Sequence, residues 1–342
     1  MKLSILTKSA LAKVFGFCGI PEARIRKQSG NSYLILMYHR VLPSGHAITP
    51  IQAGMYVDPG TFEEHLRYLK QYFRVISFSE NFSPADAVEK IRSGPPTCIL
   101  TFDDGWRDFY EYAYPILKRN HVPATVFLPT GYIGTLEWFW SDRLAWLLTS
   151  PFLPAEKENR TRSRNALLEK IAGLTGPYDE RLEAAICSLK NRRNEEIEEV
   201  IAWLKDGGNM GVAPNERAFL TWEEIREMKG SGLVSFGSHT HNHRILVHLA
   251  EQEVGEELVL SKGILVREGA VDPTFIPFCY PNGDWNERIA RMVRETGYHA
   301  AVSTENGWNA EDASPFELKR IAIHQDMARS REMFGCRIAE IM

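Results

Sequence analysis

Short apolar runs alternate with longer segments of helical periodicity from residue 33 onward, and this alternation leaves the chain few folds. Strands are expected at residues 33–38, 74–78, 97–102, 124–129, 233–238, 274–279, 300–304 and 318–323. Helices are expected near residues 61–73, 84–92, 108–120, 221–229, 250–267 and 286–296. Near-continuous apolar strands separated by helices predict an α/β fold with a helix-covered parallel sheet. Because there are about seven or eight such strands, a barrel fits as well as an open sheet.

Residues 151–213 interrupt this alternation. They are rich in charged residues, have helical periodicity and contain no strand candidate. We therefore expect a helical insertion between two β/α units. It could act as a lid or an interface, or be a solvated helical excursion without either role.

Residues 1–30 precede the main domain, which is expected to span residues 31–342. Lys8 and Lys13 interrupt the apolar start, so no uninterrupted apolar core of signal-peptide length is present. The sequence contains no run of about 18 apolar residues, so we do not expect a transmembrane span. Residues 2–17 could form a basic amphipathic helix in weak contact with a membrane surface, or a short helix packed on the domain. We expect a cytoplasmic protein, with membrane association as the alternative.

The composition excludes several classes of protein. Hydrophobic residues make up 44% and charged residues 25%, as in globular proteins and unlike disordered chains. The 40 Lys and Arg against 44 Asp and Glu give no reason to expect nucleic acid as a partner. Five cysteines without a CxxC pair indicate reduced thiols.

Two adjacent carboxylates, Asp103 and Asp104, follow the strand expected at 97–102 and precede Gly105. Both cannot be buried and charged without a compensating cation, because each loses its hydration. A divalent metal would supply that charge, with one carboxylate as ligand and the other free to move protons. The alternative is a pair of helix N-cap residues.

His239 and His243 lie four residues apart in the segment HTHNH, after the strand expected at 233–238. This spacing places both on one side of a helical turn, where they could share a metal. His241 offers a rival pairing with either of them in an extended segment, but we prefer His239 and His243 as ligands. With Asp104 they form a set of three N/O ligands that leaves coordination for water, as in catalytic zinc-type sites.

Polar residues follow several different expected strands. They are Asp103 and Asp104, His239, the turn at 280–283, His324 and His39. The carboxyl ends of parallel barrel strands meet on one face, where active sites are found. This convergence predicts a metal-dependent hydrolase. His39 could instead be a hydrogen-bonded structural residue at this face.

The motifs TFDDG, HTHNH and YPNG, in this order after YHRV, resemble the polysaccharide deacetylase family with the NodB-homology domain. The similarity covers roughly residues 30–135 and 219–325. It implies a distorted (β/α)7 barrel that removes N- or O-acetyl groups from carbohydrate with one divalent metal, commonly zinc. A set of one carboxylate and two imidazoles also suits cobalt, nickel or iron.

The resemblance also implies roles for individual residues. Asp103 corresponds to the general base, and Asp104, His239 and His243 to the metal ligands. The third family motif, Arg-x-Pro-Tyr-Gly, aligns with residues 279–283, which places Cys279 at the Arg position and Asn282 at the Tyr position. The backbone N–H of Asn282 can still stabilise the oxyanion.

The Arg that orients the base in the family is therefore missing from its usual position. We hypothesise that Arg320, on the last expected strand, replaces it. His324 is the match for the family's general acid. The fourth motif is not clearly present, and Asn306-Gly307-Trp308 is its nearest candidate.

Aromatic residues in the expected loops could contact sugar rings. The candidates for substrate contact are Tyr280, Trp285 and Trp308, with His39 beside them. The stretch Trp138-Phe139-Trp140, with Trp146 nearby, could also stack on sugar rings. Core packing fits this stretch better, because Trp138, Asp142 and Trp146 recur at helical spacing. The predicted function is removal of acetyl groups, N-acetyl foremost, from a poly- or oligosaccharide or a saccharide precursor. The alternatives are a non-catalytic carbohydrate-binding relative and an amidohydrolase acting on a small non-carbohydrate amide.

Overall fold

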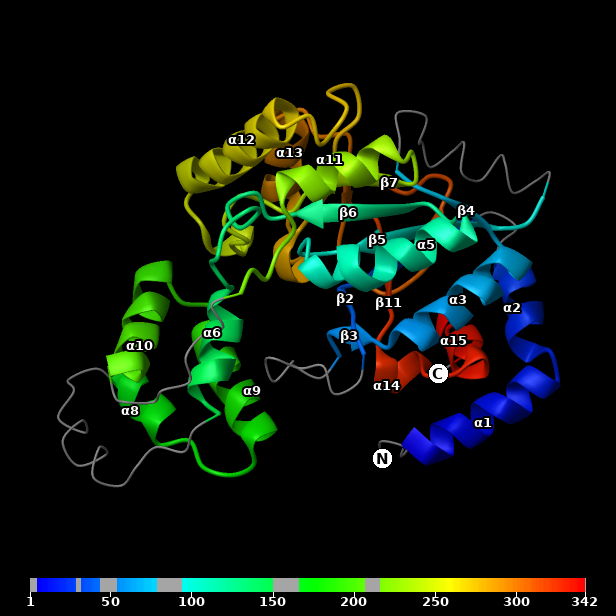
Figure 1. The fold of residues 1–342 in the computed structure, drawn as a ribbon, viewed down its shortest axis with the longest axis horizontal. Helices are drawn as coiled ribbons and strands as arrows, with labels where there is room; N and C mark the ends of the chain where they lie inside the picture. The colour runs from blue at the N-terminus through cyan, green and yellow to red at the C-terminus, as the bar shows by residue number, and fades with distance from the viewer. Residues whose placement is uncertain are drawn as a thin grey trace. The chain divides into compact units, whose positions relative to one another are not determined.

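The computed structural model describes residues 5–28, 32–43, 54–78, 94–149, 166–206 and 216–341 (Figure 1). They belong to two compact units. We call one the barrel unit, which comprises Met1–Ser44, Gly54–Thr135 and Phe219–Met342. The other is the helical unit, which comprises Gly45–Ala53 and Leu136–Ala218.

The barrel unit is built on one curled sheet in the order β10-β1-β5-β6-β7-β8-β9, with β11 also on β1 and β4 also on β5. Its strands are β1 (Ser32–Tyr38), β4 (Arg74–Ile76), β5 (Thr97–Phe102), β6 (Ala124–Leu128), β7 (Val234–Ser238), β8 (Pro277–Cys279), β9 (Ala300–Val302), β10 (Asn309–Ala310) and β11 (Ile321–Ala322). All these ladders are parallel except that of β1 with β10.

A single bridge closes the sheet. Val302 at the end of β9 pairs with Leu318 in parallel, and β11, which follows Leu318, pairs with β1. The sheet therefore curls into a distorted barrel, as the sequence predicts. A separate two-stranded sheet joins β2 (Arg40–Val41) to β3 (Tyr56–Val57).

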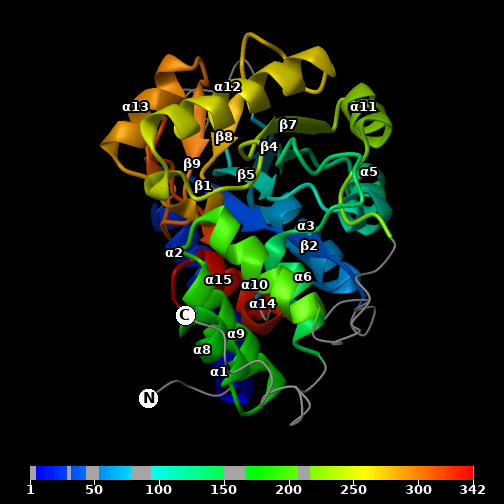
Figure 2. The same cartoon turned by 90° about the vertical axis from the view of Figure 1, so that its left-hand side faces the viewer.

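Helices surround the sheet (Figure 2). They are α1 (Ile5–Phe17), α2 (Ile20–Gln28), α3 (Pro59–Tyr72), the π-helix η1 (Phe109–Ala113) with α5 (Tyr114–Asn120), α11 (Trp222–Gly230), α12 (Glu251–Arg267), α13 (Glu287–Glu295), α14 (Gln325–Ala328) and α15 (Arg331–Ile338). Short 3-10 turns span Leu246–His248 and Pro281–Gly283. The helix expected at 84–92 lies outside the described residues.

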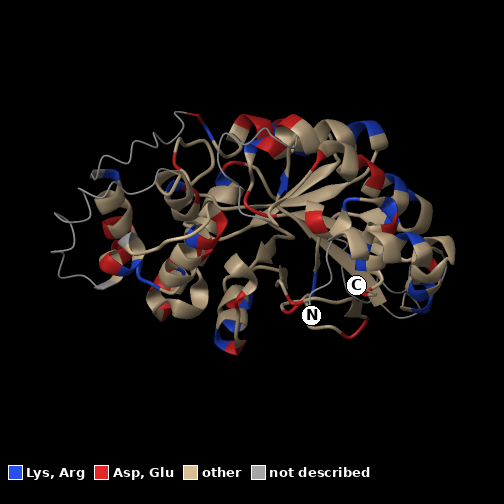
Figure 3. Ribbon diagram, turned by 90° about the horizontal axis from the view of Figure 1, so that it is seen from below, with Lys and Arg blue, Asp and Glu red and all other residues tan. Residues whose placement is uncertain are grey.

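The core has two layers because side chains on a strand alternate between faces. Tyr33 and Ile35 of β1 point into the barrel, with Phe127 and Val302. On the other face, Tyr38 and Phe102 stack at 5.2 Å between ring centroids and pack under α3 and η1. Figure 3 shows charged residues on the helices, whereas the strands are almost free of them.

The helical unit has its own apolar core. It contains α6 (Trp140–Leu147), α8 (Ala166–Ala172), α9 (Tyr178–Leu189) and α10 (Asn194–Asp206). Leucine, isoleucine and valine side chains from these helices form one buried cluster. The unit starts earlier than the insertion expected at 151–213, because α6 contributes Leu144 and Leu147 to this cluster. Trp140 packs against the cluster and Trp138 donates to the Glu216 carbonyl, so both have structural contacts.

The first helix of the barrel unit packs on the last. Ala12 and Phe15 of α1 contact Met333 and Cys336 of α15. Helix α1 therefore packs on the barrel unit, as one of the two alternatives for residues 2–17 predicts, and contact with a membrane surface stays a prediction. None of the helices in the described residues is long and apolar enough to cross a bilayer.

His65 ties α3 to the other elements and generates a test of the fold. Its Nε2 donates to the Ala328 carbonyl at 2.7 Å, its Nδ1 lies 3.2 Å from the Tyr38 hydroxyl, and its ring stacks on Phe334. Burial lowers the pKa of His65 from 6.5 to about 4. The unfolded chain therefore binds a proton that the folded protein does not bind between these values.

We expect the free energy of unfolding to fall as the pH drops from 6.5 towards 4, by on the order of 3 kcal/mol from this residue. His65→Gln should be less stable at pH 7 but should lose less stability on acidification. Urea unfolding of both proteins at several pH values measures this difference. If the free energy of unfolding of the two proteins changed equally with pH, the lowered pKa of His65 would be contradicted.

Candidate active site

A sharp turn at the end of β5 positions two buried carboxylates. Asp104 and Gly105 both have positive φ, 74° and 62°. A Cβ on Gly105 would lie 2.8 Å from Leu128 Cδ2, so the turn requires glycine. Because the chain turns here, Asp103 and Asp104 stay at the carboxyl end of the strand, where both are buried.

Three potential metal ligands converge in front of this turn. Asp104 Oδ1 lies 3.4 Å from His239 Nε2 and 3.3 Å from His243 Nε2, and the two Nε2 atoms are 3.2 Å apart. Such a cluster of one oxygen and two nitrogens is able to hold a divalent cation. The structure thus brings together the three residues that the sequence selects.

Hydrogen bonds with neighbouring groups orient the ligand atoms of His239 and Asp104. His239 Nδ1 lies 2.9 Å from the Cys279 carbonyl, which can only accept a hydrogen bond, so Nδ1 carries the proton and Nε2 is free. Trp106 Nε1 donates to the second oxygen of Asp104 at 3.0 Å. Burial opposes ionisation of Asp104, but the neighbouring imidazoles of His239 and His243 hold its pKa well below the usual value. The donor set therefore fits a divalent metal.

A buried glutamate on α12 holds the loop that carries both histidines. Glu257 accepts hydrogen bonds from the backbone N–H groups of His241 and Asn242 at 2.9 and 2.8 Å, and from Asn242 Nδ2 at 2.9 Å. The His241 ring lies against the Thr130 hydroxyl at 3.0 Å and is not in the ligand cluster. Sequence reasoning missed Glu257. The sequence signal for Glu257 is a carboxylate among the mostly apolar residues that recur at helical spacing on the buried face of α12.

Asp103 forms a buried ion pair with Arg320. Arg320 Nη1 and Nη2 donate to the two Asp103 oxygens at 2.7 and 2.8 Å, and Nη1 also donates to Thr101 Oγ1 at 3.1 Å. Arg320 is 1% exposed, and its Nε donates to the Ser303 carbonyl at 2.8 Å. Burial opposes ionisation of Asp103, yet the Arg320 guanidinium holds the pKa of the carboxyl below its usual value.

Cys279 lies beside this pair. Its Sγ is 3.3 Å from Arg320 Nη2 and 3.5 Å from Asp103 Oδ2. The guanidinium thus reaches the carboxylate from the segment before β11, although Cys279 occupies the position where the family motif has its Arg. The contact hypothesised for Arg320 is present.

Two further histidines are His39, which lies near Asp103, and His324, whose pKa is influenced by His39. His39 Nε2 lies 4.0 Å from Asp103 Oδ2. His324, at the N-cap of α14, is half-buried, with Nδ1 3.8 Å from Asp326 Oδ1. Burial and the neighbouring charge of His39 lower the pKa of His324. His324 therefore lies close enough to His39 to feel its charge, and His39 in turn lies beside Asp103.

The turn after β8 differs from expectation at Tyr280. Tyr280 is fully buried and its hydroxyl donates to the Phe316 carbonyl at 2.9 Å, so the prediction of a sugar contact is wrong there. Asn282 is exposed with φ 58°. A Cβ on Gly283 would lie 2.0 Å from Thr304 Oγ1, so the turn requires glycine. The oxyanion role of the Asn282 N–H stays a prediction.

The two tryptophans expected to contact sugar lie in different places. Trp285 is half-buried and stacks on Tyr280 at 6.3 Å between ring centroids. Trp308 donates to the Ile338 carbonyl and packs on Phe73. Phe73 immediately precedes β4, so Trp308 lies near the amino ends of the strands. The expectation that Trp308 stands at the active-site face is wrong.

Comparison with known proteins agrees with this geometry. A family model described as polysaccharide deacetylase matches residues 90–173 and 176–301. The Bacillus subtilis protein named "Putative polysaccharide deacetylase YxkH" is 23% identical over 313 residues, which cover 90% of this chain and 77% of that protein. The poly-beta-1,6-N-acetyl-D-glucosamine N-deacetylase of Staphylococcus aureus is 31% identical over 117 residues, which cover 32% of this chain and 39% of that protein.

Solved structures share the fold. The Streptococcus pyogenes deacetylase PplD, in complex with acetate, has a TM-score of 0.55 and 22% identity, over 89% of this chain and 96% of that one. IcaB from Ammonifex degensii has a TM-score of 0.55 and 18% identity, over 92% of this chain and 97% of that one. These likenesses support the distorted barrel.

The role of Glu257 can be tested by metal binding. Glu257→Gln weakens the acceptor of three hydrogen bonds, so the His239–His243 loop should loosen and zinc affinity should fall by about 10–100-fold. Titration with zinc against a competing chelator measures this change. Glu256→Gln, an exposed change on the same helix, is the control. Equal zinc affinity in both variants would contradict a supporting role for Glu257.

Proposed function

This chain belongs to the polysaccharide deacetylase family, and we propose that it is a metal-dependent hydrolase that removes acetyl groups, N-acetyl foremost, from a poly- or oligosaccharide or a saccharide precursor. One observation carries the proposal. Asp103 is a buried, ionised carboxylate that Arg320 orients directly beside three convergent ligand atoms. A general base next to a metal site is a pair of functions that can together hydrolyse an amide.

Asp104, His239 and His243 would hold the ion. The mixed nitrogen and oxygen set suits zinc first, with cobalt, nickel or iron as alternatives. When bound, the ion would supply Lewis acidity and lower the pKa of water in the site. Because Asp104 is engaged in this cluster, Asp103 is the carboxylate left to take up a proton.

Side-chain and backbone groups of the chain would carry out proton transfer and stabilise the oxyanion. Asp103 would accept the proton of the attacking water, since its lowered pKa keeps it ionised at neutral pH. The backbone N–H of Asn282 would donate to the developing oxyanion. His324 would give a proton to the departing sugar nitrogen, and His39 lies close enough to Asp103 to influence its charge. Arg320 is a positioning residue, because it acts through Asp103.

The substrate class rests on the family and on relatives. The Staphylococcus aureus relative is named for an N-acetylated glucosamine polymer, which supports N-acetyl groups over O-acetyl groups. A non-catalytic relative is disfavoured, because Arg320 restores the ion pair that Cys279 removes from the family motif. A small non-carbohydrate amide stays as the alternative substrate.

Asp103→Asn tests the base. The variant keeps an oxygen acceptor for Arg320 but cannot take up a proton, so turnover should fall by about 10²–10⁴-fold while the metal content stays unchanged. Acetate release from chitooligosaccharides, other acetylated saccharides and simple amides measures activity, with elemental analysis for the metal and circular dichroism for folding.

Wild-type protein treated with a chelator is the matched control, and added zinc should restore it. Near-normal activity in Asp103→Asn would remove Asp103 from the base role. Acetate release from simple amides alone would favour the second substrate class.

Arg320→Met tests the positioning role through pH. Arg320 is the main group that opposes the effect of burial on Asp103, so the pKa of Asp103 should rise when the guanidinium is removed. The acidic limb of the kcat/KM profile should then move to higher pH by at least about one unit, which is about tenfold in rate on that limb. Metal content should not change.

Lys319→Met, an exposed change at the preceding residue, is the control. A profile that loses amplitude at every pH without moving would mean that Arg320 supports folding only.

A further inference from the structure

The first two helices present large apolar side chains to solvent. Phe17 is 94% exposed, Leu6 81% and Val14 58%, and Ile20, at the start of α2, is 40% exposed. Leu6, Val14 and Phe17 are spaced so that they share one side of α1. Exposed apolar groups clustered on one face usually mark an interaction surface. We call these four side chains the apolar stripe.

The other side of α1 fixes the direction of this stripe. Ala12 and Phe15 pack on α15, and a Cβ on Gly16 would lie 2.8 Å from Glu332 Cγ, so glycine permits the close approach. The helix therefore has one apolar side in the protein core and another directed outward. Its outward apolar side is not accounted for by packing within the described part of the barrel unit.

The charge of this segment is opposite to that of the rest of the protein. Residues 1–28 contain six Lys or Arg and one Glu, which leaves 34 basic and 43 acidic residues in the remainder. A basic segment with exposed Phe and Leu has the composition of helices that lie in the interface of anionic membranes.

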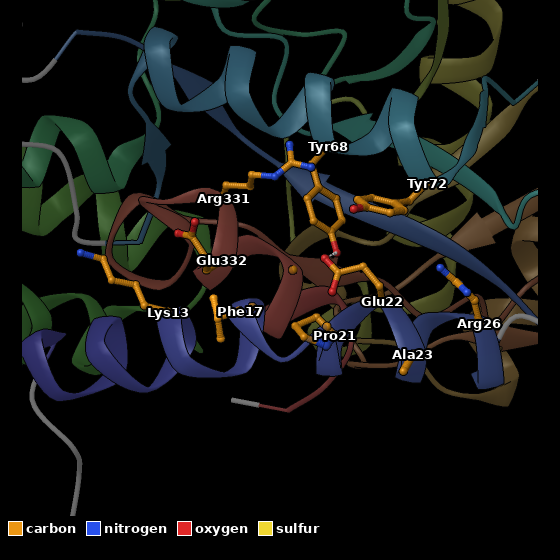
Figure 4. A pocket seen from close by; sticks show the side chains of 13 residues that line it. Lys13, Phe17, Pro21, Glu22, Ala23, Arg26, Tyr68, Tyr72, Arg331 and Glu332 are labelled. Atoms are coloured by element: carbon orange, nitrogen blue, oxygen red, sulfur yellow. Dashed lines mark hydrogen bonds between the residues drawn. The ribbon is translucent and has the colours of Figure 1, made fainter.

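A cavity of about 690 Å³ adjoins the stripe, between the α1–α2 turn and helices α3 and α15 (Figure 4). Three cationic side chains line it, Lys13, Arg26 and Arg331, together with the acidic Glu22 and Glu332. The cations thus exceed the acids by one. Phe17 lines the same cavity, which places the apolar stripe at its edge.

The far wall of the cavity is aromatic. The Arg331 guanidinium lies over the rings of Tyr68 and Tyr72, 5.0 and 5.9 Å from their centroids, and the Tyr68 hydroxyl donates to Glu22 Oε1 at 3.1 Å. These contacts hold Arg331 and Glu22 in place. The wall therefore presents a fixed cation beside a tyrosine surface, as a phosphate-bearing amphiphile would need.

We propose that α1 and α2 dock the protein on a membrane surface of anionic phospholipid. The apolar stripe enters the interface, and Lys13, Arg26 and Arg331 bind a lipid phosphate in the adjoining cavity. A second copy of the chain is a poorer occupant, because a two-fold contact would place this basic segment against itself. Free phosphate would leave the stripe exposed.

Docking in this way leaves the active site open. Tyr68 and Tyr72 lie on the last turns of α3, which ends immediately before β4 begins. The cavity is therefore near the amino ends of the strands, whereas Asp103 and His239 follow the carboxyl ends of β5 and β7. A membrane-bound molecule would keep its catalytic face accessible.

Sedimentation of the full chain with lipid vesicles tests the proposal. The protein should bind vesicles of phosphatidylcholine mixed with phosphatidylglycerol, bind pure phosphatidylcholine weakly, and dissociate as salt is added. Leu6→Ser/Phe17→Ser should lower the partition coefficient by at least about tenfold. Lys13→Ser/Arg26→Ser should lower it by about 25-fold, since each cation near the surface contributes about fivefold.

Val259→Ser/Leu260→Ser is the matched control, because these α12 side chains are 63% and 47% exposed but lie outside the basic segment. It should bind like the wild type. Absence of binding to the anionic vesicles, or an equal loss in the control, would overturn the proposal. So would displacement by inorganic phosphate beyond the effect of chloride at equal ionic strength, or a wild-type dimer that Leu6→Ser/Phe17→Ser dissociates.

Discussion

The buried ion pair between Asp103 and Arg320 is the interaction on which the candidate site depends. Taking both charges out of water costs several kcal/mol per ion, and only a close geometry with further hydrogen bonds offsets this. The guanidinium has such a geometry, with both Asp103 oxygens, Thr101 and the Ser303 carbonyl as partners. The pair links the end of β5 to the segment before β11. The guanidinium that keeps Asp103 ionised therefore comes from the segment that closes the barrel.

Cys279 and Arg320 form a compensating arrangement. Arg320 reaches the Asp103 carboxylate from the segment before β11, and the Arg of the family motif would reach it from the end of β8, where Cys279 lies. The small Cys279 side chain leaves space for the Arg320 head group, which contacts its sulfur at 3.3 Å. A motif that looks incomplete along the chain is therefore complete in space. The resemblance alone raised the question of the missing Arg, and only the tertiary contact answers it.

The sequence predicted the strands and the metal cluster because both depend on local patterns: apolar runs mark β1 and β5, and ligand spacing marks His239 and His243. It failed where exposure depends on packing from distant segments. Tyr280 follows a strand at the expected face, yet its ring is buried and its hydroxyl bonded to Phe316. The position predicted for Trp308 was wrong because the strands of the barrel are staggered relative to one another. Leu36 pairs with Ile321, so Leu318 and its partner Val302 fall near the amino end of β1.

Both loops that carry the ligands contain strained backbone. Asp104, Thr240 and His243 are non-glycine residues with positive φ, at 74°, 65° and 54°. Conformations of this kind cost about 1–3 kcal/mol each and persist only where the surroundings over-determine them. Trp106 does this for the Asp104 carboxylate, and Glu257 for the histidine loop. The ligand atoms are thus held in place by the fold itself, which is the preorganisation that charge stabilisation in a hydrolytic site requires.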